Sequence, residues 1–311
     1  MTAETESVLI ENFAVFEDTL LLSGRASGSG AIASISLHIP GKSPKAVLLG
    51  SLSSIGNQGQ FYEVIRFDPL LQDVLDSTLL VQFQDQSVQT ISHLGFPRGQ
   101  AAHGMVAQFQ AMLATRAPGH VLEIGSRARS GWTRRDFVPD GWGYTGMDVL
   151  AGTNVDVVGD AHELSSLFPA QRFDAVMSFS VFEHLLMPWK VAIELNRVLN
   201  LGAIGLVTTH QAWPLHEAPW DFWRFSDQAW RGLFNSMTGF EIIEAHMGEP
   251  AYIVPQRTHA VTAWGNGFTA YLASNVLFRK VGDTNLRWDV STADAVNTSY
   301  PAGEYGTGAK A

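Results

Sequence analysis

Short hydrophobic runs, separated by clusters of Gly, Ser, Asn and Asp, fill the first part of the chain, from residue 5 to residue 95. Residues 32–39 alternate between apolar and polar side chains almost without interruption. Such alternation is expected of a β-strand with one buried face. The other runs are also short, and the helical period does not appear among them. The pattern predicts a small antiparallel β-sandwich, immunoglobulin-like in size, over residues 1–96.

The pattern changes after residues 96–99, whose sequence Phe-Pro-Arg-Gly marks a boundary. Met105, Phe109 and Leu113 then recur at helical spacing, which predicts a helix over residues 100–116. Further on, β-rich runs alternate with helical segments, as in a mostly parallel sheet covered by helices on both faces. The β-rich runs cover residues 121–124, 144–149, 155–160, 173–180, 203–209, 239–247 and 271–281.

These runs predict an α/β domain over residues 97–290, with a seven-stranded, mostly parallel Rossmann-like sheet. Residues 291–311 are small, polar and without period. Such a segment cannot bury enough apolar surface to order itself, so we expect a flexible tail there.

Acidic residues mark three of the predicted strands. Glu123 lies inside the first run, which ends at Gly125, while Asp148 and Asp160 end the next two. Glycine at the first strand–helix turn lets backbone approach a nucleotide, and the following helix presents unpaired N–H groups. The dinucleotide pattern G-x-G-x-x-G is missing, since Arg127 occupies one of its glycine positions. Asp148 also suits a strand-end turn, and Asp160 also suits the N-cap of a helix over residues 161–167.

Residues 98–282 resemble a class I S-adenosylmethionine-dependent methyltransferase of the methyltransferase type 11 kind. Glu123 matches the acidic position of the family's first motif, Asp148 matches the second, and Asp160 followed by alanine matches the third. Residues 173–185 are similar to the fourth strand and to the start of the helix after it. The family also implies a last strand that returns antiparallel beside the sixth.

The resemblance implies S-adenosylmethionine as cofactor and S-adenosylhomocysteine as product. Asp148 is then expected to accept the ribose hydroxyls, and Asp160 with the Ala161 amide to read the adenine edge. Gly125 leaves room for the chain of the cofactor, and Glu123 lies near its amino-acid part or its ribose. The predicted cofactor-binding residues are Glu123, Gly125, Ser126, Arg127, Asp148, Asp160, Ala161 and Ser178.

The acceptor side of such a site lies beyond the fourth and fifth strands. His184 follows the fourth strand, and His210, His216 and Asp221 follow the fifth. A histidine with a carboxylate partner is the usual general base near neutral pH, so we predict a catalytic role for these four residues. Packing under a helix is the alternative for His184. We predict no metal, although two histidines and a carboxylate also suit a metal site, and Arg224 is expected to pair with Asp221.

Tryptophan is concentrated in the same segment, which contains Trp213, Trp220 and Trp223 among the nine of the chain. These rings suit a lid that excludes water, a stacking surface for a sugar, or plain packing.

Composition restricts the partners. The formal net charge is −10, and nucleic-acid binding depends on clustered Lys and Arg, so a nucleic-acid substrate is disfavoured. With 46% hydrophobic residues the chain can form a sizeable core, and no run reaches the roughly 18 apolar residues of a membrane span. The N-terminus lacks the pattern of a signal peptide, which favours the cytoplasm. The absence of cysteine excludes disulfides and thiolate chemistry.

The sequence therefore predicts a methyltransferase acting on an oxygen or nitrogen of a small molecule or sugar. A catalytically silent scaffold that keeps the fold is the second hypothesis, favoured by the single glycine of the first turn. A nicotinamide-dependent oxidoreductase is the third, disfavoured by the missing glycine pattern. The N-terminal module is expected to bind a partner or to form a homo-oligomer.

Overall fold

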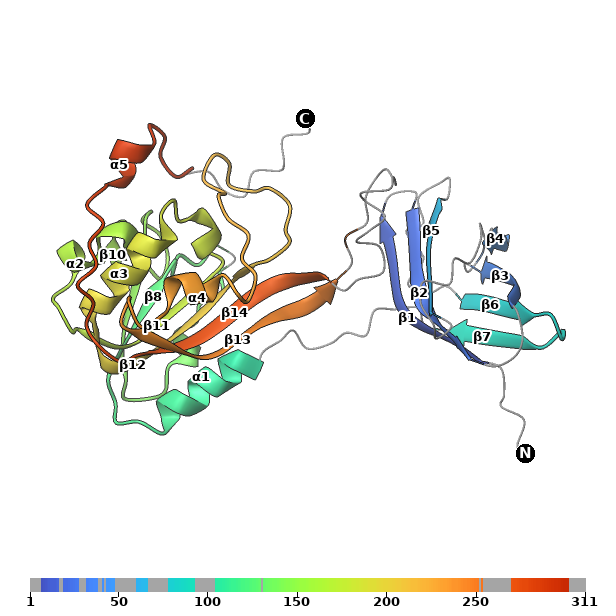
Figure 1. Cartoon of the computed structure of the whole chain (residues 1–311), viewed down its shortest axis with the longest axis horizontal. Coiled ribbons are helices and arrows are strands. Elements are labelled where there is room, and N and C mark those ends of the chain that lie inside the picture. The colour runs from blue at the N-terminus through green and yellow to red at the C-terminus, as the bar shows by residue number, and fades with distance from the viewer. Residues whose placement is uncertain are drawn as a thin grey trace. The chain divides into compact units, whose positions relative to one another are not determined.

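The structure of the protein is a computed structural model, shown in Figure 1. The chain divides into two compact units, residues 1–100 with 252–269 and residues 101–251 with 270–311. The division is discontinuous, whereas the sequence predicts a single boundary after residue 96, in a segment outside the described residues. The structure describes residues 7–16, 19–27, 32–38, 41, 43–47, 60–66, 78–92, 104–129, 131–251, 253 and 270–301.

The described part of the first unit is built from β-strands. Ile35 and Leu37 are buried in one strand, and Leu79, Val81 and Phe83 are buried at alternate positions of its neighbour. This period of two gives both strands one buried face, as the alternation of residues 32–39 predicts. The immunoglobulin-like sandwich stays a prediction. One antiparallel sheet has the order β1 (Ser7–Phe16), β2 (Thr19–Ser27), β5 (Gln60–Arg66), and the other the order β4 (Lys45–Val47), β3 (Ile32–His38), β6 (Thr78–Phe83), β7 (Val88–Ser92).

The second unit is organised around a seven-stranded sheet, which confirms the predicted fold class. Its first five strands in chain order run parallel, with the earliest at the centre. The last strand lies antiparallel between the fifth and the sixth, beside both of them. The strand order is β10 (Val157–Val158), β9 (Gly143–Asp148), β8 (His120–Ile124), β11 (Phe173–Phe179), β12 (Leu199–His210), β14 (Ala270–Lys280), β13 (Phe240–Ala251).

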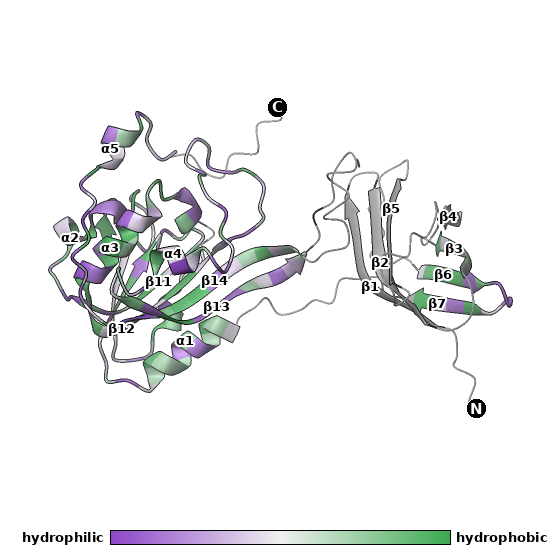
Figure 2. Ribbon diagram, in the orientation of Figure 1, coloured by the Kyte–Doolittle hydropathy of each residue, from purple (hydrophilic) through white to green (hydrophobic). Residues whose placement is uncertain are grey.

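Both faces of this sheet are buried, since neighbouring residues of one strand enter different clusters. Val121 packs with helix α1 (Gly104–Ala114) in one cluster, and Leu122 packs with α3 (Pro188–Val198) in the other. A sheet covered on both faces gives strands with continuous apolar runs, as β14 has in Figure 2. The short helices α2 (Leu164–Leu167) and α4 (Trp230–Leu233) add Leu164, Trp230 and Leu233 to the α3 cluster.

Lys280 fixes the end of α3 to the sheet. Its side chain is 1% exposed, and its Nζ donates to the carbonyl oxygens of Asn196 at 2.6 Å and Leu199 at 3.0 Å. Carbonyls at a helix C-terminus lack partners within the helix, so a buried ammonium that satisfies them holds this end in place.

Residues 291–301 differ from the predicted flexible tail. They begin with the helix α5 (Thr292–Ala295), whose Ser291 and Asp294 form a capping box. Further along, Thr298 accepts a hydrogen bond from Trp220 Nε1 at 3.2 Å, and the Tyr300 ring packs edge-on against His184. These contacts are tertiary and leave no periodicity in the sequence. The predicted tail beyond residue 301 lies outside the described residues.

Within the described ranges, no helix combines the length and the apolar character that a membrane span requires.

Candidate functional site

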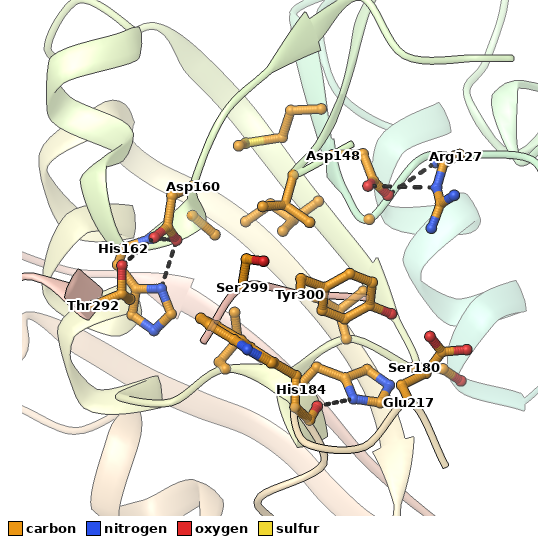
Figure 3. Close-up of a pocket in the computed structure, with 18 of the residues that line it drawn as sticks. Arg127, Asp148, Asp160, His162, Ser180, His184, Glu217, Thr292, Ser299 and Tyr300 are labelled. Carbon is orange, nitrogen blue, oxygen red and sulfur yellow. Dashed lines mark hydrogen bonds and ion pairs between the residues drawn. The ribbon is translucent and has the colours of Figure 1, made fainter. Parts of the chain in front are cut away.

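A cavity of about 1100 Å³ opens at the carboxyl edge of the parallel strands. Ligands of open α/β sheets bind at this edge. Figure 3 shows side chains from the strand ends and from the C-terminal segment pointing into one space. The predicted site residues that line it are Gly125, Arg127, Asp148, Asp160, Ala161, His184, His210 and His216.

Gly125 forms the turn that follows the central strand β8. Its φ of +79° lies in the left-handed region, and a Cβ there would come within 2.1 Å of Val181 Cγ2. Both the conformation and the space therefore require glycine. Its N–H donates to the Met147 carbonyl at 2.8 Å, which ties the turn to the end of β9. One glycine is enough to bring the backbone to the cavity wall.

Asp148 ends β9 and faces the cavity beside Arg127 (Figure 3). Its Oδ1 accepts from the Leu150 amide at 2.9 Å, so the carboxylate shapes the strand-end turn. The Arg127 guanidinium lies near, with its Nε 3.6 Å from Oδ1. Asp148 thus has both the place in the strand-end turn and the position at the binding edge that the sequence suggests.

Asp160 is the N-cap of the 3₁₀ helix Ala161–Glu163, and its side chain also faces the cavity. Its Oδ1 accepts from the backbone N–H of His162 at 2.9 Å and from His162 Nδ1 at 2.6 Å, while Oδ2 accepts from Thr292 Oγ1 at 3.0 Å. Burial acts to raise the pKa of Asp160, but the bonds from His162 and Thr292 outweigh it and lower the pKa.

Glu123 lies outside the cavity lining of the described residues, and its role near the cofactor stays a prediction. It shares a face of β8 with Val121, on the α1 side of the sheet, because alternate residues of a strand point the same way. Its carboxylate accepts from Tyr144 Oη and lies 3.4 Å from Arg134 Nη1. Burial raises its pKa. Glu123 is thus part of a buried hydrogen-bond network with Tyr144 and Arg134.

Ser126 and Ser178 also lie outside the lining of the described residues. Ser126 Oγ donates to the Asn154 carbonyl at 2.8 Å, which joins two loops. Ser178 is buried within β11, and Ser180, two residues later, reaches the cavity instead. Ser180 lies just beyond the end of β11 with a φ of +53°, so the alternation of the strand does not set its direction.

His184 lies at the opposite wall from Asp148 in Figure 3, with the Tyr300 ring between them. Its Nδ1 is 2.5 Å from the Trp220 carbonyl oxygen. A carbonyl only accepts, so Nδ1 carries the hydrogen and Nε2 keeps its lone pair. Burial lowers the pKa of His184, which favours the neutral ring.

His210 and His216 lie close to His184 and surround Glu183. His210 ends β12 and stacks on Trp213, with ring centroids 4.7 Å apart. Burial, the nearby His216 and the Arg224 charge lower the pKa of His210 to about 4. His216 packs edge-on against both other imidazoles. The three predicted histidines therefore form one cluster.

Asp221 positions His216 and does not line the cavity among the described residues. Its Oδ2 accepts from the His216 amide at 2.9 Å and lies 3.2 Å from His216 Nδ1. Arg224 holds both carboxylate oxygens, at 2.6 and 2.8 Å, which confirms their expected pairing. Burial acts to raise the pKa of Asp221, but these bonds lower it to about 2.

Three residues of the site were not predicted from the sequence. Glu183 is fully buried at the centre of the histidine cluster, although it precedes His184 in the chain. Glu217 lines the cavity and accepts from Arg129 Nη1 at 2.8 Å. Tyr300 comes from the segment predicted to be flexible. For Glu183 the available signal was a carboxylate next to a strand-end histidine; the other two depend on contacts between distant residues.

Comparison with known proteins agrees with this geometry. Residues 131–207 match the family described as "Methyltransferase domain". No curated protein matches the sequence. Among solved structures, a putative methyltransferase from Bacillus halodurans is 15% identical, with 58% of this chain and 100% of that chain covered and a TM-score of 0.44.

Two further structures are similar at comparable levels. A SAM-dependent methyltransferase from Archaeoglobus fulgidus is 15% identical, covers 56% of this chain and 94% of its own, and has a TM-score of 0.40. The 1,6-didemethyltoxoflavin-N1-methyltransferase of Burkholderia thailandensis, with bound 1,6-didemethyltoxoflavin and S-adenosylhomocysteine, is 14% identical, covers 58% and 80%, and has a TM-score of 0.41.

The family match lies within the second unit, and the sheet of that unit has the antiparallel last strand beside the sixth that the resemblance implies. The second unit therefore has the class I, Rossmann-like methyltransferase fold, and residues 131–207 within it match a methyltransferase domain family.

Proposed function

We propose that the protein transfers a methyl group from S-adenosylmethionine to an oxygen or nitrogen of a small molecule or sugar. The observation that carries this proposal is the set of side chains that line one cavity. Asp148 and Asp160 line it together with the imidazoles of His184, His210 and His216. A volume of about 1100 Å³ exceeds the common range of pockets for a single drug-sized ligand, which leaves room for donor and acceptor together.

On the donor side, the strand-end carboxylates suit the nucleoside of the cofactor. Asp148 faces the cavity, and its Oδ2 accepts a weak hydrogen bond, 3.4 Å long, from the Arg127 amide. A ribose hydroxyl can replace this contact. Asp160 and the amide of Ala161 lie at the end of the next strand, where the adenine edge is expected. Gly125 allows the methionine part to approach the backbone.

On the side of the methyl acceptor, the reaction requires a base that takes a proton and a surface from which water is excluded. The methyl carbon leaves the sulfonium sulfur as it bonds to the acceptor oxygen or nitrogen, and the electron pair of the broken bond stays on sulfur. The proton of the acceptor then passes to a base. His184 and His210 are held in the neutral form by burial and line the cavity, which suits both to this step.

Exposed aromatic rings favour a planar or sugar-like acceptor. Trp132 and Trp213 are 55% and 46% exposed, and both line the cavity. Exposed tryptophan rings next to polar groups suit the apolar face of a sugar or an aromatic ring. The net charge of −10 argues against a nucleic-acid acceptor.

A catalytically silent binding protein is the second candidate, and one observation favours it. Side chains of this chain contact both strand-end carboxylates, Arg127 at Asp148 and Thr292 at Asp160, and Tyr300 lies in the cavity. A silent protein would keep such contacts permanently. An enzyme must exchange them for the cofactor in every turnover.

The test is methyl transfer from isotope-labelled S-adenosylmethionine to panels of phenols, alcohols, amines and sugars, followed by mass spectrometry. We expect an O- or N-methylated product with one equivalent of S-adenosylhomocysteine. The product should be lost in Asp148→Asn and retained in Asp227→Asn, whose half-exposed residue is not among the described residues that line the cavity. Cofactor binding without transfer to any panel member would favour the silent protein.

A further inference from the structure

Glu183 is a fully buried carboxylate with one oxygen left without a hydrogen bond. Its side chain is 0% exposed, and its Oε2 accepts from Thr209 Oγ1. Its Oε1 has no hydrogen-bond partner among the residues that the structure describes. An unpaired buried carboxylate oxygen costs more free energy than other polar atoms, so such an oxygen calls for a cation at this position.

Ring nitrogens of three histidines converge on this oxygen. Nε2 of His210 lies 3.2 Å from Glu183 Oε1, Nε2 of His184 lies 3.8 Å away, and Nε2 of His216 lies 3.9 Å away. The ligand atoms of Glu183, His210 and His216 all lie within 4.8 Å of one another. In a tetrahedral site with bonds of about 2.0–2.1 Å, neighbouring ligand atoms lie roughly 3.3 Å apart. The His210 nitrogen lies at about this separation from Oε1, and the His216 nitrogen would have to move closer on binding.

The other nitrogen of His216 is held in the way that metal-binding imidazoles require. His216 Nδ1 lies 3.1 Å from the Pro214 carbonyl oxygen and 3.2 Å from Asp221 Oδ2. Both partners only accept, so Nδ1 carries the hydrogen and Nε2 is free to bind a cation. A carboxylate behind a ligating histidine is the usual outer partner at metal sites. Arg224 fixes Asp221 in turn.

The loop that carries His216 is also fixed to Glu183. The amides of Phe222 and Trp223 donate to the Glu183 carbonyl oxygen at 2.8 and 3.1 Å. Arg224 Nη2 donates to the carbonyl oxygens of Trp213 and Pro214 at 3.1 and 3.2 Å. The ligand atoms are therefore positioned before any cation binds, which reduces the ordering cost of binding.

We propose that Glu183, His210 and His216 bind a divalent transition-metal cation of the Zn²⁺ type, with an open position toward the cavity. Two imidazoles and one carboxylate suit zinc, while Mg²⁺ and Ca²⁺ prefer oxygen ligands. Both histidines line the cavity and Glu183 lies behind them, so the open side faces the acceptor. Resting on the proposed function, the cation would bind an acceptor oxygen and lower the pKa of its hydroxyl. His210 would then be a ligand, and His184 would be the base that takes the proton.

The competing explanation is a proton held by Glu183. Burial raises the pKa of this carboxyl, so a neutral acid within a histidine network would also satisfy the site. The substitution Glu183→Gln separates the two explanations. Glutamine resembles the neutral acid in shape and donors, but it is a poor ligand for Zn²⁺.

The test uses the full chain without any histidine tag, freed of metal by a chelator, and titrated with Zn²⁺ and with Co²⁺. We expect one Zn²⁺ per chain and visible Co²⁺ absorption bands of low coordination number. His210→Ala, His216→Ala and Glu183→Gln should each weaken Zn²⁺ binding at least 100-fold. His246→Ala, which removes a partly exposed histidine of β13 that is not a member of the cluster, should leave it unchanged. Circular dichroism compares the folding of each variant with that of metal-free wild type. Glu183→Gln is the variant whose fold is expected to change least.

The proposal is overturned if Zn²⁺ binds to Glu183→Gln as tightly as to wild type, or if wild type binds no more Zn²⁺ than the two histidine variants. S-adenosylhomocysteine binding is measured on the same metal-free samples. Cofactor binding without Zn²⁺ binding refutes the metal site and leaves the proposed function standing. Zn²⁺ binding without cofactor binding supports the metal site and counts against methyl transfer.

Discussion

Thr292 donates a 3.0 Å hydrogen bond from its hydroxyl to Oδ2 of Asp160, although 132 positions separate the two residues in the chain. This bond occupies one oxygen of the carboxylate that the family resemblance assigns to the adenine edge. Under the proposed function, the C-terminal segment and the cofactor compete for this carboxylate.

Thr292→Val is expected to bind S-adenosylhomocysteine roughly twofold to tenfold more tightly than wild type. The substitution removes the competing donor at nearly constant volume, and one hydrogen bond contributes about 0.5–1.5 kcal/mol net. Calorimetry measures the change. Thr284→Val, which removes a hydroxyl that donates to the Met237 carbonyl, is the control. Weaker binding in Thr292→Val would mean that the segment helps to hold the cofactor.

Asp160 also makes stability depend on pH. Its folded-state pKa lies below the ordinary 3.8, so the folded state favours the ionised form. The resulting stabilisation is present above pH 3.8 and is lost as the pH falls through the lower folded-state value. The difference in unfolding free energy between wild type and Asp160→Asn should thus be constant above this range and shrink below it. A difference that grows on acidification would contradict this assignment.

Gly125→Ala should abolish cofactor binding and destabilise the second unit. The added Cβ meets Val181 Cγ2 at 2.1 Å, and the φ of +79° adds strain of about 1–3 kcal/mol. Gly131→Ala is a matched control, because Gly131 has a φ of +78° and an added Cβ there would meet no atom within 4 Å. Equal effects of the two substitutions on thermal unfolding would show that backbone strain alone, without the clash, accounts for the loss.

Lys280→Met is expected to lower the free energy of unfolding of the second unit by about 2–4 kcal/mol. The methionine fills the volume of the stem but leaves the carbonyls of Asn196 and Leu199 buried without their donor. Eight of the nine tryptophans belong to this unit and only Trp264 to the other, so urea unfolding followed by their fluorescence reports mainly on this unit. Arg279→Met, at a half-exposed ion pair on the same strand, should change stability by less than about 1 kcal/mol.

Much of the second unit follows from its sequence. Strand runs that end in Asp148 and Asp160 predict both the sheet and the edge at which the cavity opens, because hydrophobic period and strand ends are local features. The side on which Glu123 lies was also implicit in its period of two with Val121. The assignment of Glu123 to the cofactor rests on the motif alone and stays a prediction.

The remaining parts of the site depend on contacts between distant residues. Tyr300 reaches His184 from a segment whose polar composition predicts flexibility, and Glu183 gains its surroundings only when the loop after β12 folds back. Neither contact has a local signature. The sequence predicts the three histidines as site residues because histidine is chemically unusual at strand ends. Their contacts with one another are seen only in the structure.

The most direct test of the account is calorimetric titration of S-adenosylmethionine and S-adenosylhomocysteine into wild type, Asp148→Asn and Asp227→Asn. We predict micromolar binding of both ligands to wild type and to Asp227→Asn. Binding to Asp148→Asn should be about 10–100-fold weaker, because the ribose hydroxyls lose a charged acceptor. Failure of both ligands to bind a folded wild-type sample would contradict the methyltransferase function.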